Sequence, residues 1–320
     1  MYAIGTFARY GEEPFPGLVI EDRRVVDLSG YGWRSVEQLL RSWFSSLPVL
    51  DHIADGGGGT ALDDLQVLAP LAPGQILQSG ANYRRHVMDI IVAEELERGS
   101  MSSEEAAVMG AELMDERAAS GEPYMFLGAA TAVCGPNDDI ILPARGKQHD
   151  WELELAVVIG IGGRHISKEA ALKHVAGYTI ANDLTTRDLV YRPDLQAIGT
   201  DWLRAKNAPT FLPIGPWIVP TRFVEDPQAL TISLSVEGQL MQNESTADMI
   251  FDVATLVSYA SSLVPLRPGD LILTGSPAGN GMHHRRFLQP GDTIVASITG
   301  LGTQRNVCVA ESPNGSVAAG

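Results

Sequence analysis

The sequence predicts an α+β protein in which β-strands dominate, with a small α+β domain at its amino end and a helical lid on the larger domain. Most of the chain after residue 124 consists of short apolar runs that are rich in β-branched residues and separated by Gly, Pro and Asp. Only two helical stretches interrupt these runs, at 168–176 and 251–264, which disfavours the regular alternation of a doubly wound sheet. Glycine and proline supply 33 and 19 of the 320 residues, as expected for a fold with many turns.

The first 72 residues predict the small domain. A strand at 3–7 precedes a hairpin that turns at 21–24, and Ser35 is placed to cap a short helix. The four glycines at 56–59 indicate a linker, because no Lys-Ser/Thr pair follows them as it would in a phosphate-binding loop.

Residues 73–313 predict the main domain, and 314–320 a disordered tail. A helical stretch at 84–119 breaks near Gly99 and forms the lid, and Ser102 and Glu105 have the spacing of a capping box for its second helix. Strands are expected within 74–80, 139–143, 152–162, 177–184, 215–220, 230–241, 270–275, 292–300 and 303–312.

Composition and charge exclude several classes of protein. With 45% hydrophobic and 19% charged residues, the chain can bury a core and is not disordered. Its net charge of −16 repels phosphate backbones and anionic lipid, so neither nucleic acid nor a membrane is an expected partner. The two cysteines lack metal-site or redox spacing, and no signal peptide or membrane span is recognisable, which favours a cytoplasmic protein.

Two glutamates interrupt an otherwise apolar run. Glu152 and Glu154 are two residues apart, so on a strand they share one face. Buried together they repel each other unless a cation neutralises them, and oxygen ligands favour Mg²⁺, Mn²⁺ or Ca²⁺ over zinc. Asp183, at the end of the strand 178–181, is placed to complete the site. The alternative is an edge strand whose glutamates point into water.

A histidine opens the lid. His86 and Asp89 are three residues apart, so on a helix Asp89 can hold one imidazole nitrogen while the other accepts a proton from water. The alternative for this pair is a surface ion contact. Lys206 and the glycine-rich turn at 274–281 offer an ammonium group, amides and hydroxyls that suit a substrate carboxylate.

Taken in order, these segments resemble the fumarylacetoacetate hydrolase superfamily over residues 73–310. The matching motifs are NYRRH at 82–86, GPNDDIILP at 135–143, DWELELAVVIG at 150–160, GYTIANDLTTRD at 177–188, WLRAK at 202–206, PIGPWIVP at 213–220, LRPGDLILTGSPAGNG at 266–281 and QPGDTI at 289–294.

The resemblance implies a mixed β-roll or sandwich domain that forms a homodimer. It implies that Mg²⁺ or Mn²⁺ is held by Glu152, Glu154 and Asp183. The small amino-terminal unit resembles the extra domain of longer family members. The residues assigned to catalysis are His86, Asp89 and Lys206, and those assigned to substrate binding are Tyr83, Arg187, Thr274, Gly275 and Ser276.

Four positions depart from the family pattern. Asp89 stands where a glutamate is usual, and Gly128 where a lysine is common. Pro209 replaces an aspartate, and Val190 replaces a glutamine. The substrate and the reaction therefore need independent evidence.

The expected function is metal-dependent hydrolysis of a carbon–carbon bond in a small anionic 2-oxo or 1,3-dicarbonyl acid, such as an acylpyruvate or a fumarylacetoacetate-like acid. In this hypothesis His86, oriented by Asp89, activates the attacking water. The alternatives are a hydratase, decarboxylase or isomerase of a 2-oxo-dienoic or oxaloacetate-like acid in aromatic catabolism. A catalytically impaired ligand-binding protein is the alternative from another class.

Overall fold

The structure, a computed structural model, describes residues 1–312, and the predicted tail at 314–320 lies outside that range. The helices are α1 (Val36–Arg41), α2 (Trp43–Gly56), α3 (Arg84–Arg98), α4 (Ser103–Ser120), α5 (Lys168–Ala171), α6 (Trp202–Lys206), α7 (Val253–Leu263) and α8 (Gly281–His284). The strands are β1 (Tyr2–Ala8), β2 (Phe15–Ile20), β3 (Arg24–Asp27), β4 (Thr60–Ala61), β5 (Gln66–Val67), β6 (Ile76–Gly80), β7 (Tyr124–Gly128), β8 (Val133–Cys134), β9 (Ile140–Leu142), β10 (His149–Asp150), β11 (Leu153–Ile159), β12 (Val175–Asn182), β13 (Thr185–Thr186), β14 (Leu212–Pro220), β15 (Thr231–Val236), β16 (Gln239–Ser245), β17 (Leu271–Leu273), β18 (Thr293–Ile298) and β19 (Gly302–Ala310).

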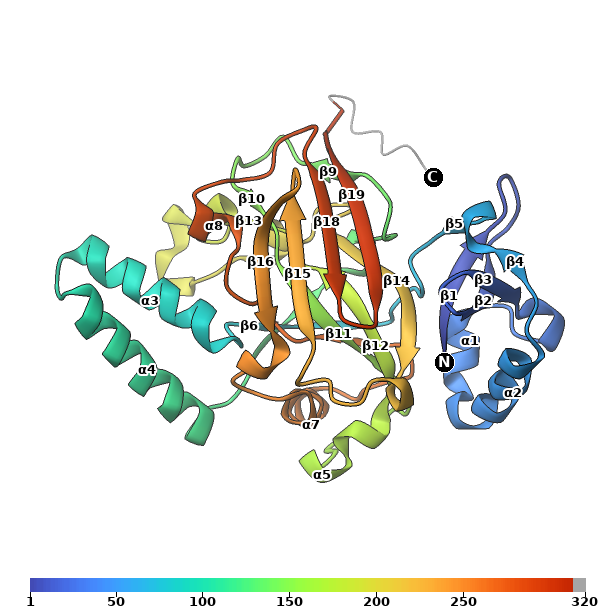
Figure 1. Cartoon of the computed structure of the whole chain (residues 1–320). Coiled ribbons are helices and arrows are strands. Elements are labelled where there is room, and N and C mark those ends of the chain that lie inside the picture. Colours follow the sequence, from blue (N-terminus) through green and yellow to red (C-terminus); the bar gives the residue numbers. More distant parts are fainter. Residues whose placement is uncertain (313–320) are drawn as a thin grey trace.

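Two mixed sheets form the body of the protein, which confirms the predicted α+β class with strands dominant (Figure 1). The larger sheet has the strand order β4-β3-β2-β1-β14-β12-β11-β17-β6-β7, and β5 and β8 pair at its side. The smaller sheet has the order β16-β15-β18-β19-β9. Among the described residues, no helix is both long and apolar enough to cross a membrane.

The core lies between the two sheets. Leu155 and Val157 of β11 share a buried cluster with Ile232 and Leu234 of β15. Because side chains alternate along a strand, Glu154 points to the opposite face of the large sheet, together with Ala156 and Val158. That opposite face carries the candidate site.

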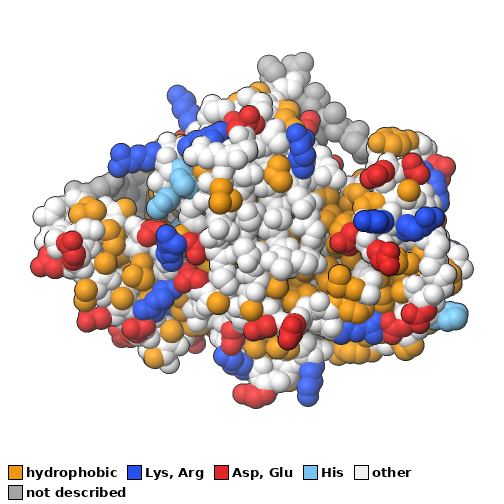
Figure 2. All heavy atoms as spheres, viewed as in Figure 1, with side chains coloured by type: hydrophobic (Ala, Val, Ile, Leu, Met, Phe, Trp, Pro, Cys, Tyr) orange, Lys and Arg blue, Asp and Glu red, His pale blue; other side chains and the backbone are white. Residues whose placement is uncertain are grey.

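The lid is a pair of antiparallel helices, α3 and α4, that projects from one end of the body (Figure 1). Ser102 caps α4 through the predicted capping box with Glu105, and Gly99 ends α3 with a positive φ of 66°. Hydrophobic and acidic side chains lie side by side on the lid surface (Figure 2).

The amino-terminal helices are longer than predicted. Ser35 caps α1 as expected, but a second helix, α2, continues to Gly56 and contains Pro48. Proline inside a helix lacks the N–H for a backbone hydrogen bond, and its ring clashes with the preceding turn. Pro48 therefore disfavours a helix in this segment, and the sequence predicts only the first, shorter helix. The predicted helix at 168–176 is α-helical only at Lys168–Ala171, continues as a 3-10 turn at Leu172–His174 and ends where β12 begins at Val175. The short helices α6 and α8 were not predicted.

The proposed division at residue 72 stays a prediction. Strand β1 pairs with β14 of the main domain through Ile4 and Ile218, so the large sheet runs across the division. The structure contains one chain, and the homodimer also stays a prediction.

Gly177 provides a test of the packing that supports the site. A β-carbon at this position on β12 would lie 2.3 Å from the carbonyl oxygen of Val219. We expect Gly177→Ala to lower the free energy of unfolding by about 1–3 kcal/mol, because the two strands would have to move apart. Gly30→Ala is the matched control, since nothing lies within 4 Å of a β-carbon there. Equal unfolding midpoints in urea for the two variants would contradict the expectation.

Candidate metal centre

Glu152, Glu154 and Asp183 converge on one point. Each offers a carboxylate oxygen, these oxygens lie within 4.8 Å of one another, and all three residues are buried. The antiparallel pair β11 and β12 explains the convergence, because Glu154 lies opposite Ala181 and Asp183 is two residues further along the same chain. The alternative of glutamates pointing into water is wrong, as Glu154 is 1% exposed.

Glu152 does not lie on the strand that carries Glu154. It occupies the link between β10 and β11, where its N–H donates to Asn182 Oδ1 at 2.9 Å. Its carbonyl oxygen accepts the N–H of Asp183 at 2.8 Å. These two bonds fasten Glu152 beside Asp183, so the site depends on a link that strand periodicity does not describe.

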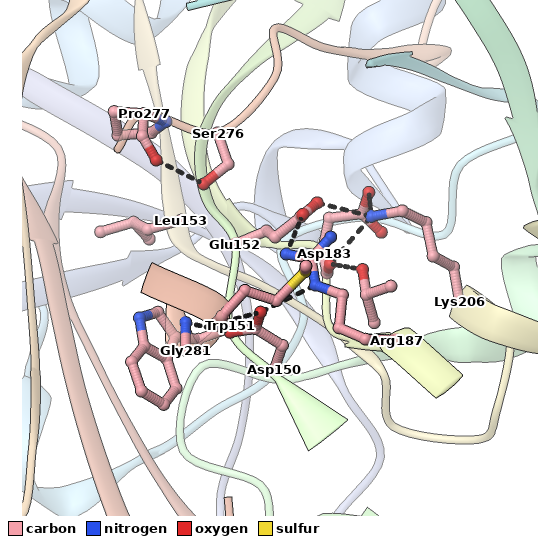
Figure 3. A network of polar contacts seen from close by, with 12 residues as sticks. Asp150, Trp151, Glu152, Leu153, Asp183, Arg187, Lys206, Ser276, Pro277 and Gly281 are labelled. Carbon is pink, nitrogen blue, oxygen red and sulfur yellow. Dashed lines mark hydrogen bonds and ion pairs between the residues drawn. The ribbon is translucent and has the colours of Figure 1, made fainter. Parts of the chain in front are cut away.

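Two cations, the buried Lys206 and the partly buried Arg187, meet these acids (Figure 3). Lys206 Nζ lies 2.6 Å from both Glu152 Oε2 and Asp183 Oδ2, and it also donates to the Asp183 carbonyl at 3.2 Å. Arg187 bridges Asp150 and Glu152, with Nε 2.7 Å from Asp150 Oδ2 and an Nη atom 2.5 Å from Glu152 Oε1. Lys206 thus stands between two of the three predicted metal ligands.

The cluster has more acids than cations. Asp150, Glu152, Glu154 and Asp183 carry four negative charges when ionised, whereas Arg187 and Lys206 carry two positive ones. The deficit equals the charge of one divalent cation. Three converging carboxylates also form an oxygen-only donor set, so these residues fit Mg²⁺ or Mn²⁺ better than zinc.

The three carboxyl groups differ in acidity. Burial alone would raise the pKa of Glu152, but Arg187 and Lys206 outweigh it and lower that pKa to about 2. Burial raises the pKa of Asp183 to about 6, against the pull of Lys206. Burial and the neighbouring Asp183 raise the pKa of Glu154 well above its ordinary value. Within residues 1–312, Glu154 is the acid of this cluster that forms no ion pair.

This acidity predicts a pH-dependent affinity for metal. The pKa of Glu154 is raised well above its ordinary value and that of Asp183 is raised to about 6, so protons compete with a cation for these carboxylates and Mn²⁺ affinity should rise with pH. Titration calorimetry in two buffers of different ionisation enthalpy should show proton release at pH 6. The release should be smaller at higher pH, and equal heats in both buffers at pH 6 would contradict the expectation.

His86 lies near this cluster, but Asp89 contacts another histidine. Burial lowers the pKa of His86 to about 4, against the attraction of Glu152, so the imidazole is neutral and able to accept a proton. Asp89 Oδ2 lies 3.8 Å from His283 Nδ1. Within residues 1–312, no hydrogen bond joins His86 to Asp89, and the predicted pair therefore stays a prediction.

The glycine-rich turn contacts the acids directly. The N–H of Gly275 donates to Glu154 Oε2 at 2.7 Å. Gly275 has a φ of +90°, and a β-carbon at this position would lie 3.0 Å from Asn82 Cβ, so the position requires glycine. Thr274 is fully buried and donates to the Leu155 carbonyl.

The remaining predicted substrate contacts are also engaged or enclosed. The Ser276 hydroxyl accepts a hydrogen bond from Gln242 at 3.0 Å. Tyr83 is fully buried at the start of α3. A substrate role for Tyr83, Thr274 or Ser276 therefore stays a prediction, since each side chain is buried in this structure.

Sequence reasoning missed two residues of this cluster. Asp150 accepts hydrogen bonds from Arg187 and from the N–H groups of Gly281 and Met282 at the start of α8. Gln78, on β6, donates to Asp183 Oδ1 at 2.6 Å. The signal for Gln78 was a polar residue directly after the apolar pair at 76–77, whereas Asp150 ends the polar run 145–150 and carried no such signal.

Comparison with known proteins places the chain in a family. Residues 75–309 match the family model described as the C-terminal domain of fumarylacetoacetate hydrolase. A 2,4-didehydro-3-deoxy-L-rhamnonate hydrolase from Sphingomonas sp. (strain SKA58) is 33% identical over 308 residues, which cover 93% of this chain and 94% of that protein. The mitochondrial oxaloacetate tautomerase FAHD2B of Bos taurus is 42% identical over 190 residues, covering 59% of each chain.

Solved structures agree with this placement. A probable 2-hydroxyhepta-2,4-diene-1,7-dioate isomerase from Mycobacterium abscessus aligns with a TM-score of 0.76 and 31% identity, over 97% of this chain and all of that one. Maleylpyruvate hydrolase from Sphingobium sp. SYK-6, in complex with manganese(II) and pyruvate, aligns with a TM-score of 0.73 and 25% identity, over 97% of this chain and 99% of that one. The chain therefore belongs to the fumarylacetoacetate hydrolase superfamily, and it is an enzyme of that superfamily.

Proposed function

We propose that this enzyme is a metal-dependent hydrolase that cleaves a carbon–carbon bond in a small 2-oxo or 1,3-dicarbonyl acid such as an acylpyruvate. The observation that carries the proposal is the buried cluster of four acids and two cations, whose deficit matches one divalent ion. Mg²⁺ or Mn²⁺ held by Glu152, Glu154 and Asp183 would act as a Lewis acid on the chelated 2-oxo acid. The manganese and pyruvate in the related maleylpyruvate hydrolase support this choice of ion and substrate class.

The chain's own residues supply the proton transfers. Neutral His86 accepts a proton from water, and the hydroxide attacks the carbonyl distal to the carboxylate. The bond between that carbonyl carbon and the adjacent methylene carbon breaks, and its electron pair remains on the methylene carbon. His86 then returns the proton to this carbon. One water is consumed, and an acylpyruvate yields pyruvate and a second carboxylic acid.

Lys206 is the cation proposed to bind the anionic end of the substrate. The Lys206 ammonium lies 5.9 Å from the centre of the Phe126 ring and 5.7 Å from that of Trp202, and these aromatic faces hold the charge in place. Its three hydrogen bonds all go to Glu152 and Asp183. To bind a substrate carboxylate, Lys206 therefore has to exchange one of these partners.

A product assay tests the proposed hydrolysis. The purified protein with added Mn²⁺ is incubated with acylpyruvates, 2-oxo-dienoates and oxaloacetate. Pyruvate is measured with lactate dehydrogenase and the second acid by chromatography. Equal amounts of pyruvate and the second acid support cleavage. Loss of dienol absorbance without fragments indicates hydration, and released CO₂ indicates decarboxylation; either outcome would contradict the hydrolase.

Tautomerisation of an oxaloacetate-like acid is the second candidate. It is supported by the similarity to oxaloacetate tautomerase and by the contact of Asp89 with His283. A tautomerase moves a proton between carbon and oxygen and needs no activated water. Decay of the enol absorbance of oxaloacetate, with no pyruvate formed, would identify this activity.

A further inference from the structure

Gln78 is a buried polar side chain to which the proposed function gives no role. It lies on β6 between two neighbouring strands, opposite Leu273 of β17 and Phe126 of β7. Its exposed fraction is 2%, and it faces the same side of the sheet as Ile76, where the acid cluster lies. An amide in this position must be explained by what it contacts.

The amide of Gln78 holds Asp183 from one side. Its Nε2 lies 2.6 Å from Asp183 Oδ1, and the nitrogen must face that oxygen because a carboxylate only accepts hydrogen bonds. Lys206 holds the other oxygen, Oδ2, also at 2.6 Å. Asp183 is thus fixed between one neutral donor and one charged donor.

Gly128 makes room for this amide. It lies opposite Ile76 on the neighbouring strand, and a β-carbon at position 128 would lie 3.0 Å from both Cδ and Oε1 of Gln78. Oε1 is buried, and no donor in the described part of the chain reaches it. A larger side chain at position 128 would therefore displace the amide from Asp183.

The two donors on Asp183 differ in how they respond to a cation. A divalent ion held by Glu152, Glu154 and Asp183 would repel the Lys206 ammonium, which contacts carboxylate oxygens of Glu152 and Asp183. Gln78 is neutral and binds the opposite oxygen, so its bond is compatible with the ion. Donors of this kind orient the ligands that bind a metal directly.

We propose that Gln78 is a positioning residue that keeps Asp183 oriented for metal, and that Gly128 is required because Gln78 is present. This inference rests on the proposed function only in taking Asp183 as a metal ligand. It assigns a chemical role to two positions of this chain, one of which, Gly128, departs from the family pattern. The role is structural support for metal binding, without contact between Gln78 and the reacting atoms.

Gln78→Met provides the direct test, because methionine has a similar length and no donor. Titration calorimetry with Mn²⁺ should show an affinity about 10- to 100-fold weaker than that of the wild type. The electron paramagnetic resonance spectrum of bound Mn²⁺ should also change. Asn306→Leu is the matched control: Asn306 is a buried amide that donates to the carbonyls of Gly135 and Asp138, neither of which belongs to the acid cluster. This control should lower the thermal unfolding midpoint and leave Mn²⁺ affinity unchanged.

A double-mutant cycle tests the link to Gly128. Gly128→Ala should weaken Mn²⁺ binding in the wild type, but change it by less than about twofold in Gln78→Met, because no amide remains to be displaced. If Gln78→Met does not fold, Gln78→Asn, which retracts the amide by one methylene, is expected to show the same loss.

Each remaining outcome has a distinct meaning. Mn²⁺ affinity of Gln78→Met within about twofold of the wild type would overturn the inference. Additive effects of the two substitutions would overturn the link to Gly128. Absence of Mn²⁺ binding in the wild type would overturn the proposed metal function itself.

Discussion

Replacing Glu154 by glutamine should abolish Mn²⁺ binding and leave the protein folded. Among the described residues, Glu154 accepts a hydrogen bond from Gly275 and forms no ion pair, so glutamine removes the charge without leaving a buried cation unpaired. We expect Mn²⁺ affinity to fall at least about 100-fold, because loss of a direct ligand should cost more than the about 10- to 100-fold lost when a residue that only supports a ligand is replaced. Turnover should be lost with it. Calorimetry measures the affinity, and an unchanged metal stoichiometry would remove Glu154 from the site.

The same substitution should stabilise the metal-free protein as pH rises. The pKa of Glu154 is raised in the folded state, so the folded protein binds more protons than the unfolded one above the ordinary carboxyl pKa. Stability is then lost as pH rises, because Glu154 must ionise without a partner. Glutamine cannot ionise, and urea denaturation should show a flatter dependence on pH in Glu154→Gln than in the wild type.

Glu152→Gln and Asp183→Asn make an informative contrast. Each removes a charge that Lys206 contacts at 2.6 Å, so a buried cation loses a partner. Breaking a buried pair in this way costs about 3–5 kcal/mol of folding free energy. These variants should therefore lose both metal binding and stability, whereas Glu154→Gln should lose only metal binding.

His86→Asn should lower turnover by about 100- to 10,000-fold, the usual contribution of a general base. Mn²⁺ affinity should stay unchanged, because His86 is not among the three converging carboxylates. The measurement is kcat with saturating Mn²⁺ on the substrate found in the product assay. If turnover were unchanged, His86 would not be the base, and a ligand-binding protein with adventitious activity would be favoured.

Asp89→Asn completes that experiment. If Asp89 orients His86 during turnover, this variant should lose activity nearly as strongly as His86→Asn. If Asp89 remains with His283, as in this structure, the loss should be slight and should match that of His283→Asn. The comparison decides whether the predicted pair forms when substrate binds.

The acid cluster was predictable from the sequence because charged carboxylates are costly to bury in an apolar segment. Two carboxylates in an apolar run and a third at the end of the next strand have few stable arrangements other than convergence on a cation. Strand alternation then places Glu154 and Asp183 on one face, as the pairing of β11 with β12 shows. The capping box at Ser102 was predictable for the same reason, since its two residues satisfy each other locally.

The supporting contacts were not predictable from spacing. Gln78 reaches Asp183 across 105 residues of sequence, and only the order of β6, β17, β11 and β12 in the sheet brings them together. Lys206 lies on a five-residue helix that shows no periodicity, and its position between Glu152 and Asp183 depends on folding of the whole sheet. Local sequence pattern thus identifies the acidic metal ligands, whereas the order of strands in the sheet determines which side chains contact them.

The pairing of β1 with β14 sets a limit on where this protein can be cut. The recognised family segment begins at residue 75, yet β14 is a nine-residue buried strand whose hydrogen-bonding edge is shared with the first strand of the chain. A fragment trimmed to the family boundary would lose β1 and expose this strand edge, whose N–H and C=O groups could then pair with other fragments and cause aggregation. A protein produced for experiments should therefore include β1 as well as the family segment 75–309.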